Sequence, residues 1–375
     1  MSELNASNLR KERGNEGPDL VGVTELTSPY YMVPPSGTTS ERPQNPQAGT
    51  LRFNTDIGSL EYFKGDTLGW ESINRVPSAP IGGRMLIGGG SWSSPIATNT
   101  IEYVTISTLG NSKDFGDLNV SRGFARATAS WTRGIFAGGR PSHEEIDYVT
   151  IALLGNALDF GNLSVGREDS VPVSDGTRGV MGGGGNHPGS PAYLNTIDFI
   201  TIPSTGNATD FGDLTTASRH HAAVENRVRG VWTGAYGETN RNTIQYITIQ
   251  TTGNAVDFGD LNVRSYGHGG LGNNVRGLII HGRNHPAGTN VNSIDYITIN
   301  TTGNATDFGD TTQLHYAASC SSSPTRGIIA GGAGGAGNTI EYLEIMTTGN
   351  AKDFGDVSGS GFSHSGGTSN AHGGL

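Results

Sequence analysis

Cysteine, lysine and long apolar runs are nearly absent from this chain of 375 residues. The one cysteine, Cys320, has no second cysteine with which to form an intrachain disulfide or half of a metal pair. No apolar run approaches the length of a membrane-spanning helix. The polar first residues, 1–17, lack the apolar segment of a secretory signal. We therefore expect a soluble protein that is made in a cytoplasm and does not insert into a membrane.

Charge is also scarce. Charged residues make up 15% of the chain, against about 25% in a typical soluble domain. The formal net charge is −10. Because nucleic acids are bound by clustered cations, this balance gives no reason to expect a nucleic-acid partner.

Glycine, in contrast, is abundant, with 59 residues, about twice its ordinary share. Hydrophobic residues are only 34% of the chain, but with glycine they reach the ordinary globular share of about 50%. The extra glycine therefore takes the place of charged residues and not of the hydrophobic residues that form a core. Most of the chain is not expected to be disordered. No three-residue glycine period indicates collagen.

An internal repeat organises most of the chain. A Gly-Asn-x-x-Asp-Phe-Gly segment occurs six times, and an Ile-x-(Tyr/Phe)-x-x-Ile segment begins 13 residues before its aspartate in every copy. The glycine of the next Arg-Gly pair follows the aspartate by 20 residues in all five cases. The repeat length varies from 45 to 51 residues, and all of this variation falls between that pair and the next isoleucine. The six aspartates are Asp114, Asp159, Asp210, Asp257, Asp307 and Asp353.

Each repeat predicts four short strands. In the second repeat they are expected at 124–131, 134–138, 146–151 and 158–163, where β-branched and aromatic residues are bounded by Gly, Asn and Ser. No stretch has a sustained helical period with caps. Four antiparallel strands per repeat of this length are typical of a β-propeller blade.

The first repeat, which starts near Arg84, lacks a first strand, and residues 358–371 supply a spare one after the last repeat. Pairing of this spare strand with the first repeat removes the exposed edges that an open array of repeats would leave. The sequence therefore predicts an all-β fold with a six-bladed β-propeller in residues 82–375, closed by the C-terminal strand.

These units resemble kelch repeats. Arg219-His220-His221, Gly138-Gly139, Tyr148 and Phe160 occupy the places of the kelch Arg-x-x-His, glycine pair, tyrosine and strand-four aromatic. Phe replaces the usual Trp, and two copies lack the glycine pair. The resemblance covers residues 82–375 and implies a fold, not an activity.

Residues 35–80 precede the propeller as a small β attachment module. Arg52-Phe53-Asn54-Thr55-Asp56, Leu60-Glu61-Tyr62-Phe63 and Gly69-Trp70 resemble a short module of bacteriophage tail fibres and virion appendages. We expect a three-stranded meander at 50–56, 59–64 and 69–73, and so small a sheet is barely stable alone. Residues 1–34 lack periodicity and are expected to form an extended arm that orders on a partner.

The repeats also resemble virion structural proteins of marine phages. Together the two resemblances imply a protein located in the virion, assembled in the host cytoplasm and present in multiple copies. Residues 1–75 would then contact other virion proteins.

Neither common phosphate-binding pattern is present. The Asp-Phe-Gly copies lack the catalytic loop, glycine-rich loop and strand lysine of a kinase. The glycine-rich runs lack the Gly-Lys-Ser/Thr ending of a phosphate loop. No cofactor is expected.

The loop between the second and third strands is the only one whose length varies, and such loops often mark the binding face of a repeat protein. The connections between blades lie at the same end of the blade as this loop. Guanidinium groups suit carboxylate or sulfate, and aromatic faces suit sugar rings. Solvated loop residues are the alternative, and no ligand spacing supports a metal site at His187 and His285. The candidate ligand-binding residues are Trp92, Arg122, Arg140, His143, Arg167, His187, Arg219, His220, Tyr236, Arg241, Arg264, Arg283, His285 and His315.

The leading hypothesis is a tail-fibre or appendage protein whose propeller binds a host surface glycan or protein. The alternatives are a head-decoration or neck protein whose propeller contacts other virion proteins, and a polysaccharide-degrading appendage enzyme. No Ser-His-Asp order, Cys-His order or carboxylate pair stands out from the repeats, so we do not expect an enzyme.

Overall fold

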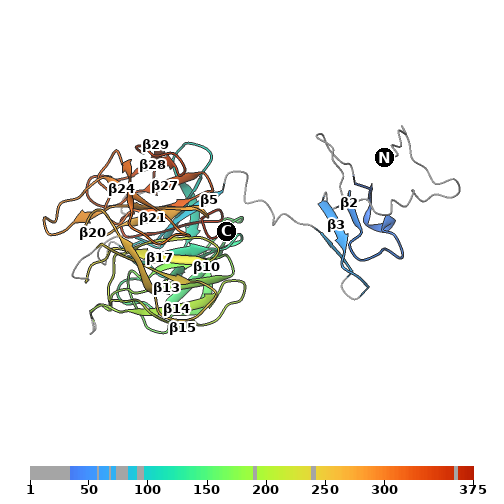
Figure 1. Cartoon of the computed structure of the whole chain (residues 1–375), viewed down its shortest axis with the longest axis horizontal. Coiled ribbons are helices and arrows are strands. Elements are labelled where there is room, and N and C mark those ends of the chain that lie inside the picture. The colour runs from blue at the N-terminus through green and yellow to red at the C-terminus, as the bar shows by residue number, and fades with distance from the viewer. Residues whose placement is uncertain are drawn as a thin grey trace, which may run out of the picture. The chain divides into compact units, whose positions relative to one another are not determined.

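The structure is a computed structural model and describes residues 34–56, 59–66, 69–72, 83–90, 97–188, 192–237, 242–358 and 362–375. The chain divides into two compact units, Met1–Pro77 and Ser78–Leu375 (Figure 1). Within the described ranges every regular element is a β-strand, apart from one short 3-10 helix, so the predicted all-β class is confirmed. No helix among these residues is long and apolar enough to cross a membrane.

The first unit contains a sheet in the order β1-β2-β3-β4. The antiparallel strands β2 (Leu51–Asn54), β3 (Ser59–Phe63) and β4 (Trp70–Ser72) lie at the predicted meander. Two elements were not predicted: β1 (Ser36–Gly37), which pairs in parallel with β2, and the 3-10 helix η1 (Thr39–Glu41).

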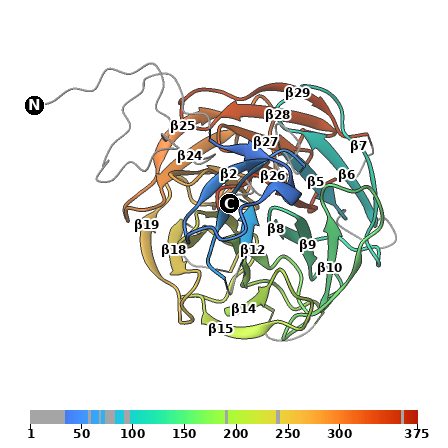
Figure 2. The ribbon, with the colours of Figure 1, turned by 90° about the vertical axis from the view of Figure 1, so that its right-hand side faces the viewer.

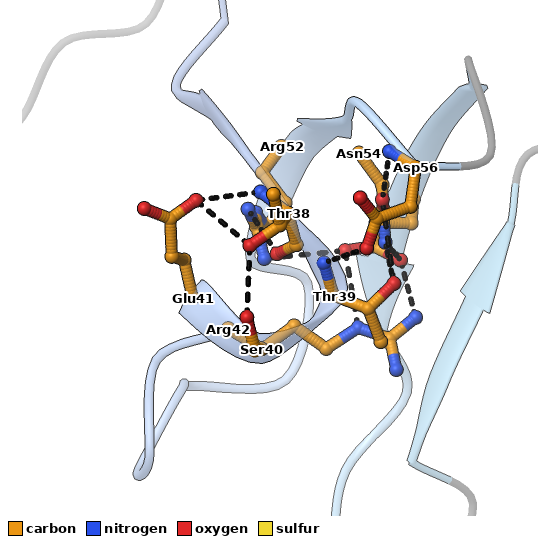
Figure 3. A network of polar contacts seen from close by, with 9 residues as sticks. Thr38, Thr39, Ser40, Glu41, Arg42, Arg52, Asn54 and Asp56 are labelled. Carbon is orange, nitrogen blue, oxygen red and sulfur yellow. Dashed lines mark hydrogen bonds and ion pairs between the residues drawn. The ribbon is translucent and has the colours of Figure 1, made fainter.

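An ionic network connects η1 to this sheet (Figure 3). Glu61 is fully buried and accepts hydrogen bonds from Arg42 Nη2 at 2.6 Å and from Asn54 at 3.1 Å. Arg52 Nη1 lies 3.4 Å from the same carboxylate, and both guanidinium groups lie over the ring of Trp70. The hydrogen bonds from Arg42 hold the pKa of Glu61 below its ordinary value, although burial opposes them.

Among its described residues, the second unit contains six four-stranded antiparallel sheets. With the strands of each sheet in spatial order, the first sheet consists of β30 (Gly366–Ser369), β5 (Arg84–Gly88), β6 (Thr100–Thr105) and β7 (Lys113–Asp117). The second consists of β8 (Arg126–Ala129), β9 (Arg133–Ala137), β10 (Glu145–Thr150) and β11 (Leu158–Asn162). The third consists of β12 (Val171–Ser174), β13 (Arg178–Gly182), β14 (Thr196–Thr201) and β15 (Thr209–Asp213). The fourth sheet consists of β16 (Ala222–Glu225), β17 (Arg229–Thr233), β18 (Thr243–Thr248) and β19 (Val256–Asp260). The fifth consists of β21 (Gly269–Gly272), β22 (Arg276–Ile280), β24 (Ser293–Thr298) and β25 (Thr306–Asp310). The sixth consists of β26 (Ser319–Ser322), β27 (Arg326–Ala330), β28 (Thr339–Glu344) and β29 (Lys352–Asp356). A two-stranded pair, β20 (Ser265–Tyr266) and β23 (Arg283–Asn284), lies beside the fifth sheet in sequence.

The sheets follow one another around a common centre (Figure 2). The first strand of each contacts the first strands of its two neighbours, in the circuit β8-β12-β16-β21-β26-β30 and back to β8. Six apolar clusters each combine side chains of two neighbouring sheets. The C-terminal strand β30 pairs with β5, as the sequence predicts, and so completes the sheet of the first repeat.

The Gly-Asn turn of each repeat joins two sheets. The Gly155 N–H donates to the Phe115 carbonyl at 2.8 Å, and the Ala157 N–H donates to the Asp117 carbonyl at 2.7 Å. The Asp117 N–H donates to the Asn156 side chain at 3.0 Å. The same three contacts recur at every junction, including the one from residues 354–356 to 110–112.

The arginine that begins the second strand of each sheet also joins two sheets. Its guanidinium lies 4.3–4.6 Å from the centre of an aromatic ring on its own third strand. The same group donates to the carbonyl of an isoleucine in the next sheet, at 2.6–3.2 Å. Arg326 donates to Ile106 and thereby joins the last repeat to the first.

A cavity of about 70 Å³ is lined by residues of all six first strands. Arg126, His221, His268, Cys320 and His372 contribute side chains to its lining. Burial raises the pKa of the Cys320 thiol to about 12, so the thiol stays protonated and weakly nucleophilic at neutral pH.

Candidate functional site

A left-handed residue precedes the first strand of every sheet, at the same place in each repeat. Outside glycine this conformation is uncommon, and bulky side chains adopt it at a cost in energy. Such strained positions concentrate at functional sites. With their φ angles, the six residues are Phe124 (58°), Asp169 (59°), His220 (61°), Gly267 (71°), Ala317 (55°) and His364 (58°).

Hydrogen bonds connect these six positions into a closed circuit. Five N–H groups donate to the carbonyl of the equivalent residue one sheet earlier, at 2.8–3.0 Å. At the sixth junction the His220 N–H donates instead to Asp169 Oδ2, at 2.8 Å. The backbone geometry thus repeats six times, whereas the side chains do not repeat as the core motifs do. These are the positions at which a chemical function can vary without disturbing the fold.

Two adjacent, fully buried carboxylates, Glu168 and Asp169, lie at this circuit. Asp169 pairs with the guanidinium of Arg126 and lies 2.6 Å from Nδ1 of His220. Burial alone would raise the pKa of Asp169, but the charges of Arg126 and His220 hold it well below its ordinary value. Asp169 is therefore an ionised anchor at neutral pH.

Glu168 holds two arginines at the surface. It pairs with Arg219 and lies 3.6 Å from Nε of Arg140, and these arginine side chains are 22% and 29% exposed. Burial raises the pKa of Glu168, and the charges of the two arginines oppose that rise. The carboxylate fixes the position of both guanidinium groups.

Aromatic rings continue from these arginines along an arc. Arg219 lies 5.7 and 5.9 Å from the ring centres of Tyr193 and Tyr236. The ring centres along the arc are 5.9 Å apart for Tyr193–Tyr236, 5.1 Å for Tyr236–Tyr266, 6.0 Å for Tyr266–Tyr316, 5.4 Å for Tyr316–His364 and 4.2 Å for His364–Phe124.

Arg283 joins the arc through the backbone pairing of β20 and β23, which places it opposite Tyr266. Its side chain is exposed, while the four tyrosines are half-buried. Burial raises the pKa of Tyr316, and the charges of Arg283 and Arg219 oppose the rise, so both charges act on this ring. We call the set Arg140, Tyr193, Arg219, Tyr236, Tyr266, Arg283 and Tyr316 the Tyr–Arg surface.

Several predicted site residues belong to this region. Arg140, Arg219, Tyr236 and Arg283 are part of the Tyr–Arg surface, and His220 lies in the circuit beneath it. His187 is exposed, and its Nε2 lies 3.1 Å from Nη2 of Arg140.

Three other predicted site residues are buried in ion pairs that connect secondary-structure elements. Arg122 pairs with Asp147 at 2.9 Å, Arg167 pairs with Asp198 at 3.0 Å, and His315 lies 3.1 Å from Glu341. All three side chains are almost fully inaccessible to solvent. They stabilise the sheets and do not reach the surface.

The remaining predicted site residues are scattered. His143 lies 3.0 Å from the Glu145 carboxylate. Arg264 is exposed, and its carbonyl accepts a hydrogen bond from the N–H of the half-buried His285 at 2.8 Å. Trp92 and Arg241 lie outside the described residues.

Sequence reasoning missed Glu168, Asp169, Tyr193, Tyr266 and Tyr316. A signal was available for some of them, because five of the six left-handed positions lie ten residues before the glycine of an Arg-Gly pair, as Asp169 does before Gly179. A search for the non-repeating residue at that fixed step would have found Asp169 and its neighbour Glu168.

Within the described ranges, no group of three or more His, Cys, Asp or Glu side chains is placed to hold a metal ion. The arrangement is suited to binding, since guanidinium groups pair with carboxylate or sulfate and phenol rings stack on sugars. Comparison of the chain with protein-family models and with curated proteins finds no match.

Proposed function

We propose that Ser78–Leu375 is a closed, six-bladed, kelch-like propeller whose Tyr–Arg surface binds a ligand on a host cell. Six four-stranded sheets, six shared apolar clusters and the circuit of first-strand contacts support the closed ring. The single observation that carries the binding role is the set of six left-handed positions, which have one backbone geometry and diverse side chains.

The first unit is proposed to attach the propeller to a phage particle. Phe63, which is 7% exposed, is the one buried apolar side chain among its described residues, and the network around Glu61 replaces much of a core. So small a sheet gains stability from further burial. We propose that residues 1–75 pack on other virion proteins, in a tail fibre or another appendage that binds a host surface glycan or protein.

A double variant, Tyr266→Ala with Arg283→Ala, tests the proposal. Particles that carry it should assemble normally and adsorb at least tenfold more slowly to host cells. Thr209→Ala, an exposed change on the outer strand β15, is the matched control and should adsorb as the wild type does.

Absence of the chain from purified particles, measured by mass spectrometry, would end the virion proposal. Normal adsorption together with defective assembly would instead assign the propeller to contacts between virion proteins. New reducing ends after incubation with host surface polysaccharide would favour the appendage enzyme.

A further inference from the structure

We infer that the ligand of the Tyr–Arg surface is an anionic polysaccharide. Its carboxylate or sulfate groups would pair with Arg219 and Arg283, and its sugar rings would stack on Tyr236, Tyr266 and Tyr316. The inference rests on the proposed binding function and names the class of ligand.

The distribution of charge favours an anionic ligand. The fourth strands β7, β11, β15, β19, β25 and β29 together contain eleven aspartates and two lysines, so they account for most of the net charge of −10. The region of the Tyr–Arg surface has the opposite sign. There Arg126, Arg140 and Arg219 lie against the carboxylates of Glu168 and Asp169, and the charge of Arg283 acts on Tyr316. The region thus holds four arginines and two carboxylates. An anionic chain is therefore attracted to this surface and repelled by the outer strands.

Arg219 is held in position before any ligand binds. Glu168 pairs with one of its nitrogens, and the rings of Tyr193 and Tyr236 flank the guanidinium. Its side chain is 22% exposed. A pre-positioned, partly exposed guanidinium favours binding of a planar carboxylate or a sulfate, because little side-chain entropy is lost.

Arg283 supplies a second, more accessible cation. Its Nε donates to the Gly288 carbonyl at 2.6 Å. This hydrogen bond restricts the orientation of the guanidinium, while the side chain stays exposed. The backbone pairing with Tyr266 sets a cation beside a half-buried ring. Arg219 lies beside Tyr236, and Arg283 lies opposite Tyr266. A polysaccharide that carries acidic groups could therefore contact a cation and a ring at both places.

The test measures binding of the full chain to polygalacturonate, dextran sulfate and dextran by biolayer interferometry at several salt concentrations. Affinity for one or both anionic polymers should exceed that for dextran at least tenfold and should fall as salt rises. Preference between the two anionic polymers assigns carboxylate or sulfate as the recognised group.

Variants assign the binding to this surface. Arg283→Ala should weaken anionic binding about tenfold and leave any dextran binding unchanged, whereas Tyr266→Ala should weaken both. Lys113→Ala removes an equal charge from the exposed start of β7 and should have no effect. Near-ultraviolet circular dichroism checks that each variant is folded.

Equal affinity for dextran and the anionic polymers would overturn the inference and leave the proposed binding role intact. A chain that binds none of the three, while Tyr266→Ala with Arg283→Ala still slows adsorption, would show that the ligand is a protein and overturn the inference alone. Normal adsorption of that double variant would overturn the proposed function.

Discussion

The last glycine of each Gly-Asn-x-x-Asp-Phe-Gly segment occupies backbone that other residues rarely adopt, with φ between 143° and 151°. Gly259 also lies close to the turn of the next sheet, and a Cβ built on it would lie 2.4 Å from the carbonyl oxygen of Gly303. Gly253 has a similar φ of 152°, but a Cβ built on it would have no neighbouring atom within 4 Å. Alanine substitutions at these two glycines therefore separate the cost in stability of the positive φ from the cost of the close approach between two sheets.

Gly253→Ala should destabilise the protein by about 1–2 kcal/mol, since it meets only the unfavourable φ. Gly259→Ala should cost about 3–5 kcal/mol, because the junction between two sheets must also open. Urea unfolding followed by tryptophan fluorescence measures both. Equal losses would mean that the close approach contributes nothing to the need for glycine.

His221 makes the second unit sensitive to acid. Burial lowers its pKa to about 4, with Asp169 opposing the shift and His220 and Arg126 adding to it. Between about pH 6.5 and 4 the unfolded chain binds a proton at this residue that the folded chain does not, so stability falls as the pH falls. The shift corresponds to about 3 kcal/mol at full effect.

His221→Gln should therefore lessen the loss of stability on acidification. The free energy of unfolding of the wild type should decrease more than that of the variant between about pH 7 and pH 4.5, by up to about 3 kcal/mol. Urea titrations at a series of pH values measure the two slopes. Parallel profiles would show that His221 does not titrate in this window.

At the scale of elements, each fourth strand would be an exposed sheet edge if the Gly-Asn turn of the next repeat did not cover part of it. Those turns pair with the strand backbone at 2.7–3.1 Å at every junction between neighbouring sheets. The exposed aspartates of the same strands add charge to what remains of the edge, which discourages pairing with another chain.

Strand β30 completes one sheet from the other end of the chain, so its removal should be disproportionately costly. A chain that ends at Ser358 exposes the edge of β5 and uncovers Met85 and Ile87, which are fully buried in the intact protein. We expect it to aggregate, and a peptide of residues 359–375 added during refolding should restore solubility. Sedimentation assays measure both, and a soluble, cooperatively folded truncated chain would contradict the expectation.

The sequence predicts these elements well because their period repeats. In the second repeat the observed strands β8 to β11 lie within one residue of, or inside, the predicted ranges. Strands β1, β20 and β23 were missed because two-residue strands have no measurable alternation.

The candidate site was harder to predict, since one sequence does not show which polar groups meet. Arg122 and Arg219 both follow a fourth strand and both carry a guanidinium, but Arg122 is buried against Asp147 while Arg219 reaches the surface beside Tyr236. Position in the repeat predicts the end of the sheet at which a residue lies. Its burial depends on the neighbouring sheet.

At the scale of the whole molecule, Met1–Pro77 and Ser78–Leu375 are separate compact units, so we expect them to unfold independently. A chain of residues 78–375 should show the same main thermal transition as the full chain, within about 2 °C. Differential scanning calorimetry measures the transition, with the full chain as control. A much lower midpoint for the shorter chain would mean that the first unit stabilises the second.

Strand β5 follows the first unit in the chain and lies between β30 and β6. Tension that enters at Arg84 pulls this strand along its own axis, between an antiparallel neighbour on each flank. In that direction the hydrogen bonds of both flanks bear the load together in shear and are not peeled apart one by one. Drag that reaches the second unit through the first would thus act on a strand paired along both flanks, and the pairing that completes the first sheet would also serve as the anchor of the tether.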